Sequence, residues 1–427
     1  MARKIWKFLL LFVFGLFFCP AVLGSSSATK LAKAVYSDDL EEVSKIVDEL
    51  VGRGGVKDAE AIFKVALSSR LDIEPDIYEV LLKGLARLNS PECLEFYAKQ
   101  LKGRKAPPKI VVIEAASRMK DPKGIDLIDQ VHKDKENSVV ETALEAVRIR
   151  KPREAIPVLI DLVEKWTARK VKDAVFYNIK DTLIELTGEN LKTVEDWRKW
   201  WGINERTFDP KNIREAKRTV RKRVLGSEDD PTFFGVPISS KNAVFVIDTS
   251  ASMLLVQKDD IPGLTRVRGA DVTEIVQRPK ERLTPENARL AKFWRRIEMA
   301  KRQLCKVLQQ LKPPTKINII AFNTRVIPFS KRSRTVTGSL KKKAIKWVKA
   351  LRPRDYTDTL GALKAAFKSD PKVNTIYFLS DGIPSKDGKT IDDAKAILDT
   401  VLKMNRFRKI RIHTFGFYPF TMDGFPI

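Results

Sequence analysis

The stretch Ala243-Val-Phe-Val-Ile-Asp-Thr-Ser-Ala-Ser252 decides how the second half of the chain folds. It opens with five apolar residues, mostly β-branched or aromatic, which is typical of a strand buried on both faces in a parallel sheet. Asp248, Ser250 and Ser252 follow at alternate positions. Ligand sites in open α/β sheets lie beyond the carboxyl ends of the strands. The three side chains offer hard oxygen ligands, which suit Mg²⁺, Mn²⁺ or Ca²⁺; the alternative is an ordinary polar turn.

Length and composition indicate a soluble globular protein of two or three domains. The chain has 427 residues, of which 43% are hydrophobic and 31% charged, enough for more than one core. Its formal charge of +26 favours anionic partners such as acidic polysaccharide, lipid head groups or nucleic acid. A generally lysine-rich, solvated surface is the alternative explanation.

The first residues have the pattern of a secretory signal. Arg3, Lys4 and Lys7 precede an apolar run over residues 8–18, and Val22-Leu-Gly24 supplies a small-residue cleavage site. We therefore predict a signal peptide over residues 1–24 and a secreted or periplasmic, bacterial protein. Membrane association is expected only through this segment, if it stays uncleaved.

Cysteine and histidine are scarce in the rest of the chain. After residue 24 the only cysteines are Cys93 and Cys305, and the only histidines are His132 and His413. This argues against a disulfide framework, against zinc enzymes and against His-dependent nucleophilic catalysis. We expect a protein that is not an enzyme.

Residues 29–205 have helical periodicity and an internal repeat. Pro91, Pro122 and Pro152 recur at intervals of 31 and 30 residues, each between two apolar-faced helical segments. Proline fits the first turn of the second helix, where its missing N–H costs nothing. The pattern resembles short HEAT-type repeats, which stack into an all-α solenoid; an ordinary helical bundle is the alternative. Residues 206–240 are expected to form a basic linker.

Strands and helices alternate in the remainder, which predicts a doubly wound α/β domain over residues 241–427. A loop at 253–285 could shape a binding rim or be a tolerated insertion. After this loop, the sequence predicts one long helix over residues 286–311. A later helix is predicted directly after Thr357. The further strands are expected at Ile317–Phe322, Arg325–Phe329, Thr375–Ser380 and Ile410–Phe415, the second of these antiparallel.

Asp-x-Ser-x-Ser at 248–252, the downstream Thr357 and Ser380-Asp381-Gly382 after a strand resemble the metal-ion-dependent adhesion site of the von Willebrand factor A family. The resemblance covers roughly residues 233–418. It implies that Ser250 and Ser252 bind the metal directly, and that Asp248, Thr357 and Asp381 bind it directly or through water. One position would stay open for an acidic residue of a partner. Mg²⁺ is favoured over Ca²⁺ and Mn²⁺. The Thr357 hydroxyl could instead cap the helix that follows.

The resemblance implies a non-enzymatic adhesion module that binds a protein partner through a divalent cation, and the predicted signal peptide implies that it is exported. The alternative is a scaffold whose helical repeats bind envelope proteins or anionic polymer, with the metal only structural. A dehalogenase-type phosphotransferase needs Asp where Ser250 stands, and a phosphate-binding loop at Gly382 has one residue too many. Nucleic acid is not expected for an exported protein. Because the family normally continues beyond the fourth parallel strand seen here, we also expect a C-terminally truncated domain; the alternative is a shortened sheet with an exposed face.

Overall fold

The structure is a computed structural model of the chain. It describes residues 26–130, 134–168, 173–213, 230–255, 284–382, 384–387 and 389–417. The predicted signal peptide, His132, the middle of the predicted linker (214–229) and most of the 253–285 loop lie outside these ranges. The chain divides into two compact units, Met1–Val158 and Leu159–Ile427, and the division falls inside helix α10 (Ala155–Thr167).

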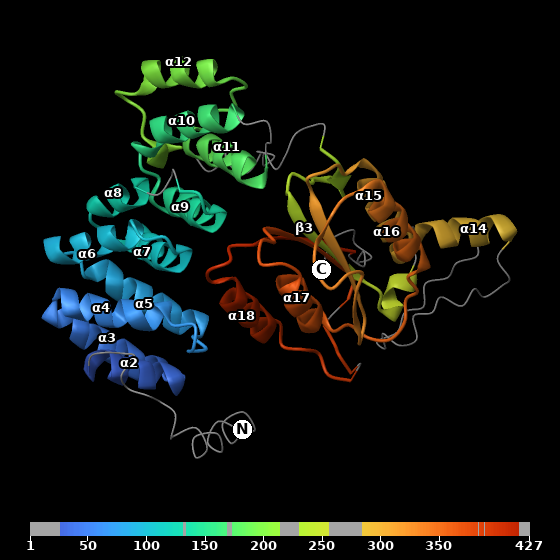
Figure 1. The fold of residues 1–427 in the computed structure, drawn as a ribbon, viewed down its shortest axis with the longest axis horizontal. Coiled ribbons are helices and arrows are strands. Elements are labelled where there is room, and N and C mark those ends of the chain that lie inside the picture. Colours follow the sequence, from blue (N-terminus) through green and yellow to red (C-terminus); the bar gives the residue numbers. More distant parts are fainter. Residues whose placement is uncertain are drawn as a thin grey trace. The chain divides into compact units, whose positions relative to one another are not determined.

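The first unit consists of helices in two rows (Figure 1). In one row α3, α5, α7 and α9 pack against each other in turn, and in the other α2 packs against α4, α4 against α6 and α6 against α8. This arrangement supports the predicted helical, repeat-like region. The helices are α2 Ser26–Tyr36, α3 Leu40–Arg53, α4 Val56–Leu67, α5 Pro75–Arg87, α6 Pro91–Leu101, α7 Ala106–Arg118, α8 Lys123–Asp129 and α9 Asn137–Arg150.

The repeated prolines do not all take the place that their spacing predicts. Pro91 is the first residue of α6, as expected, and the Ser90 side chain accepts a hydrogen bond from a backbone N–H of that first turn. Pro122 is instead the residue before α8. Pro152 stands three residues before α10, where its carbonyl accepts from the N–H of Ala155. The expected first-turn position is therefore wrong for Pro122 and Pro152, because each of these prolines lies in the turn that precedes its helix.

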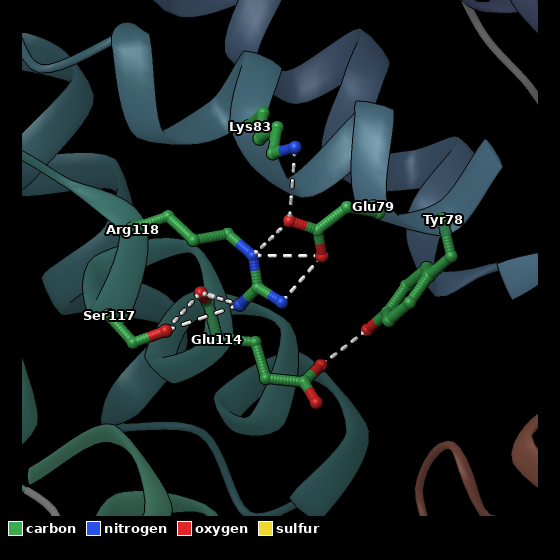
Figure 2. Close-up of polar contacts among 6 residues, drawn as sticks. All are labelled: Tyr78, Glu79, Lys83, Glu114, Ser117 and Arg118. Carbon is green, nitrogen blue, oxygen red and sulfur yellow. Dashed lines mark hydrogen bonds and ion pairs between the residues drawn. The ribbon is translucent and has the colours of Figure 1, made fainter. Parts of the chain in front are cut away.

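Charged side chains join successive helices of the α3–α5–α7 row. Arg87 of α5 pairs with Asp48 of α3, and Arg118 of α7 pairs with Glu79 of α5. In both pairs the partners are 39 residues apart, so the same link recurs in consecutive repeats. Figure 2 shows the second pair, in which the Arg118 Nε lies 3.0 Å from both carboxylate oxygens of Glu79 and Nη2 lies 2.6 Å from Oε2.

The second unit contains a six-stranded sheet with the order β5-β4-β3-β7-β8, in which β6 also pairs with β4. Strand β3 (Asn242–Asp248) lies in the middle with all of its residues buried, and it pairs in parallel with β4 and β7. The predicted doubly wound α/β class is confirmed. The other strands are β4 Lys316–Phe322, β5 Val326–Pro328, β6 Arg334–Thr335, β7 Thr375–Ser380 and β8 Arg411–Gly416, and β1 Thr232–Phe233 pairs with β2 Val236–Pro237.

Helices pack on both faces of this sheet. Phe245 and Ile247 of β3 belong to one core with residues of α15 and α16, whereas Val244 and Val246 belong to the other with residues of α17. Burial on both faces explains why the apolar run does not alternate. The helices of this unit are α11 Ala174–Thr187, α12 Val194–Asn204, α14 Pro285–Trp294, α15 Arg296–Gln310, α16 Gly338–Ala350, α17 Thr359–Lys368 and α18 Ala394–Asn405, with short turns η2 Pro210–Asn212 and η3 Ala251–Leu254.

The single long helix predicted over residues 286–311 is wrong. It is broken at Arg295, whose backbone is extended (φ −60°, ψ 137°), so that α14 ends at Trp294 and α15 begins at Arg296. The N–H of Arg296 donates to the carbonyl of Leu255 at 3.0 Å instead of joining a continuous helix. Among the described residues, no helix has the length and apolar character needed to cross a membrane.

Candidate metal centre

The loop after β3 turns the three predicted oxygen ligands toward each other. Asp248 is the last residue of β3, and its Oδ1 accepts from the N–H of Ser250 at 2.7 Å. The hydroxyls of Ser250 and Ser252 lie 2.9 Å apart. Thr249, between them, is tied to the end of β4 by its N–H and its hydroxyl, both donating to the carbonyl of Phe322. This anchoring holds the loop at the carboxyl end of the sheet.

Asp381 meets this loop because β3 and β7 are neighbours. Ile247 of β3 pairs with Leu379 of β7, so the two strands end side by side. The Ser252 hydroxyl donates to Asp381 Oδ1 at 2.7 Å, and the Ser380 hydroxyl donates to Asp248 Oδ2 at 2.6 Å. Each loop thus hydrogen-bonds to the carboxylate of the other.

Thr357 reaches the same place from a third loop. Its backbone forms an isolated antiparallel bridge with Ser385, and the residue is buried. A Cβ added at Gly382 would lie 3.4 Å from Thr357 Oγ1 and 3.6 Å from Ser252 Oγ. The two hydroxyls therefore border one small space that the missing side chain of Gly382 leaves open.

The alternative role of Thr357 as a helix cap is excluded by its neighbour. Asp358 is the N-cap of α17, and its side chain accepts from the N–H of Gly361 at 2.9 Å. Because that capping position is filled by Asp358, the Thr357 hydroxyl is not used as the cap. The structure thus joins Asp248, Ser250, Ser252 and Asp381 by hydrogen bonds and places the Thr357 hydroxyl near Ser252, so the five predicted ligand residues come from three loops.

Arg296 is a member of this cluster that the sequence did not reveal. Its Nη1 lies 2.8 Å from Asp381 Oδ2, and the two side chains are only 7% and 0% exposed. The break before α15 places Arg296 in the first turn of that helix, next to the site. No motif marks it, because an arginine in a helical pattern is common and the break contains neither Gly nor Pro. Ser380 belongs to the motif by sequence, but only the structure shows that its hydroxyl donates to Asp248.

The charge of the cluster is balanced only in part. Two carboxylates face one guanidinium, which leaves a formal charge of −1 if both acids are ionised. Asp248 is fully buried, and this burial, together with the negative charge of Asp381, raises the pKa of Asp248 to about 6. A buried carboxylate with a raised pKa gains from an added cation, since the cation compensates the charge that burial penalises.

The donor set fits a hard divalent cation. It offers two carboxylates and two serine hydroxyls joined by hydrogen bonds, and the Thr357 hydroxyl faces Ser252 across the space beside Gly382. A hydroxyl has one hydrogen; since Ser252 donates its own to Asp381, Ser250 is the donor in the bond between the two serines, and Ser252 keeps a lone pair for a cation. No group of three or more His, Cys, Asp or Glu residues suited to a metal occurs in the described ranges, so any metal here depends on the hydroxyls.

Comparison with known proteins relates the C-terminal part of the chain to the von Willebrand factor type A domain. The family model of this domain matches residues 292–425. The human von Willebrand factor A domain-containing protein 3B is 28% identical over 123 residues, which is 29% of this chain and 9% of that protein. The chain thus spans about a tenth of the length of this relative. The predicted resemblance is confirmed for the C-terminal region; Thr357 and Asp381 lie inside the matched residues, whereas the Asp248 loop precedes them.

Proposed function

We propose that the second unit is a protein-binding module that depends on a divalent cation. The von Willebrand factor type A domain by itself indicates a protein-interaction module, of a kind that is typically not an enzyme. The observation that supports metal dependence is the hydrogen-bonded set of oxygens on Ser250, Ser252 and Asp381, next to the space that Ser252 and Thr357 border at Gly382. The residues that would hold Mg²⁺, or alternatively Ca²⁺ or Mn²⁺, are Asp248, Ser250, Ser252, Thr357 and Asp381.

A bound cation would supply an electrophilic centre for an acidic residue of a protein partner. The electrostatics of the cluster favour this role. With Arg296 paired to Asp381, the cluster carries a formal charge of −1, so a divalent ion brings it to +1. Two carboxylates alone would only neutralise the ion. The guanidinium therefore adds to the attraction for a carboxylate from outside.

We also propose that the module works outside the cytoplasm. The support is the basic start, apolar run and small-residue site within residues 1–24. Detection of the mature chain beginning at Ser25 by N-terminal sequencing of the exported protein would support this. An unprocessed N-terminus in the cytoplasmic fraction of the native host would contradict it.

The metal assignment is tested with Asp248→Asn, which removes one charge at constant shape. Calorimetric titration with Mg²⁺ should show binding to the unaltered protein and at least a tenfold loss in the variant, since a divalent ion loses one of its two carboxylates. The matched control is Asp399→Asn on α18, which removes a carboxylate that is paired with Lys395 away from the cluster. The control should bind Mg²⁺ as the unaltered protein does, and equal affinities in all three would refute the site.

Partner binding separates the proposal from its alternative. Pull-down with the full chain as bait, with and without EDTA, should lose its partners on chelation, and Asp248→Asn should lose them even in Mg²⁺. Partners that stay bound in EDTA and also stay bound to Asp248→Asn would favour a scaffold in which the helical repeats do the binding. In that case the metal would be only structural.

A further inference from the structure

Charge is distributed very unevenly within the second unit. Residues 299–354 contain sixteen lysines and arginines and no aspartate or glutamate, whereas residues 355–399 contain eight acidic and six basic residues. The acid-free segment comprises most of α15, strands β4 to β6 and α16. An unbroken run of one sign over this length concentrates positive potential on the part of the unit that these elements form.

Helix α16 gathers this charge on one face. Lys342, Lys343, Lys346 and Lys349 are all exposed. They follow the spacing of a single helical face, and on the opposite face Leu340, Ala344 and Val348 are buried in the core. We call these four residues the α16 lysine face. Further exposed cations stand on the elements around it: Lys306 and Lys312 near the end of α15, and Lys331, Arg332 and Arg334 beside β6.

We propose that the α16 lysine face docks this unit onto a lipid bilayer that carries anionic head groups. A flexible ammonium is a point charge that suits a diffuse layer of phosphates, whereas planar, bidentate recognition of a defined phosphate uses arginine. The face consists of lysines only. Single-stranded nucleic acid is bound by grooves with exposed aromatic platforms, but the one aromatic residue of α16, Trp347, is half-buried and packs edge-on against Phe329.

Helix α14, which packs against α15, exposes two apolar side chains suited to the head-group region. Leu290 and Phe293 of α14 are 39% and 48% exposed. The guanidinium of Arg302, in α15, lies 3.7 Å from the centre of the Phe293 ring and so links the two helices. Exposed apolar side chains add buried apolar area to the electrostatic attraction that a basic segment has for anionic lipids. This route to a membrane does not need the N-terminal segment, and it is independent of the metal site.

The test is co-sedimentation of the full chain with vesicles in EDTA, so that metal-dependent binding is silenced. Mixed phosphatidylcholine–phosphatidylglycerol vesicles should bind the protein at about 0.1 M salt, whereas pure phosphatidylcholine vesicles should not. Raising the salt concentration to about 1 M should release the protein, because the Debye length falls from about 10 to about 3 Å. Replacing all four lysines of the α16 face by Gln should weaken partitioning by between about tenfold and a thousandfold, since each lysine near an anionic surface contributes at most about a factor of five.

Two matched variants control for net charge and for folding. Lys57, Lys64, Lys99 and Lys102 are exposed positions of the first unit; replacing these four by Gln removes the same charge and should leave vesicle binding nearly unchanged. Replacing the α16 lysines by Arg keeps the charge and should keep binding. Equal losses in both Gln variants would overturn the proposal, as would retention of the protein on heparin or DNA through the α16 lysines without any binding to anionic vesicles.

Discussion

An arginine pairs with a carboxylate in each of the two units, and the pairs differ in their access to water. In the helical unit, the side chains of Arg118 and Glu79 are 28% and 37% exposed, and Lys83 also approaches the carboxylate (Figure 2). In the second unit, the side chains of Arg296 and Asp381 are 7% and 0% exposed. The chemistry is the same, but solvent screens only the first pair.

Exposure decides what each pair can do. Burial acts to raise the pKa of Glu79, but the hydrogen bond and the charge from Arg118 outweigh it and leave that pKa lowered. The pair joins two helices, and its removal should lower the free energy of unfolding only slightly. At the candidate metal centre the carboxylates have no such access to water, and the pKa of Asp248 is raised. A buried ion pair there neutralises a carboxylate whose unpaired charge would strongly destabilise the fold.

The largest expected effect comes from removing the buried arginine. Arg296→Met should lower the free energy of unfolding in EDTA at neutral pH by about 3–5 kcal/mol, because it leaves a buried carboxylate without its partner. Arg118→Met, the matched change in the helical unit, should cost roughly 1 kcal/mol or less. Urea denaturation of both variants measures the difference. Similar losses would show that the buried pair has no special part in the charge balance of the cluster.

The next effect is a pH dependence that belongs to Asp248. Its folded-state pKa of about 6 lies above the ordinary value of 3.8, so the folded protein holds this proton more tightly than the unfolded chain. The resulting stability is fully present below about pH 4 and is lost as the pH rises through 6, by about 3 kcal/mol in total. Asp248→Asn cannot titrate there. Between these pH values, the free energy of unfolding measured in EDTA should therefore fall more steeply with rising pH for the unaltered protein than for Asp248→Asn. Parallel curves for the two proteins would contradict the assignment.

A smaller effect is expected on metal affinity. Arg296→Gln removes a positive charge beside the proposed cation site while keeping a hydrogen-bond donor for Asp381. The variant should bind Mg²⁺ more tightly, by about tenfold or more, because it no longer repels the ion. Calorimetric titration at neutral pH provides the measurement. Weaker Mg²⁺ binding would mean that the guanidinium mainly holds Asp381 in position.

The smallest effect concerns the exposed pair. Glu79→Gln should cost less than about 1 kcal/mol, and raising the salt concentration should reduce even that, because exposed charges are screened. Thermal unfolding at low and high salt compares the variant with the unaltered protein. A loss that does not change with salt would place this pair in the same class as Arg296 and Asp381.

The sequence predicts well those parts of the fold and of the candidate site that depend on local sequence pattern and on the order of the strands. The apolar run before Asp248 indicates a central strand, and the polar side chains after β3 and β7 converge because the two strands are neighbours. The sequence allows Thr357 to be either a ligand or a helix cap, and only the structure shows that Asp358 caps the helix. The metal itself, its identity and the partner remain predictions.

The features that the sequence did not reveal depend on contacts between distant segments. No Gly or Pro marks the break at Arg295 in the sequence. The break is stabilised instead by a hydrogen bond from the N–H of Arg296 to the carbonyl of Leu255, a residue 41 positions earlier. That break is what brings Arg296 to Asp381. The positions of Pro122 and Pro152 relative to α8 and α10 also escape the sequence, because the repeat spacing alone does not determine the turn ahead of each helix.

The most direct test of the metal centre is anomalous diffraction from crystals of the protein grown with Mn²⁺, which can stand in for Mg²⁺ at hard oxygen sites. The account predicts one strong manganese peak among the side-chain oxygens of Asp248, Ser250, Ser252, Thr357 and Asp381. A well-ordered cluster without a peak, or a manganese ion bound only elsewhere on the unit, would contradict it.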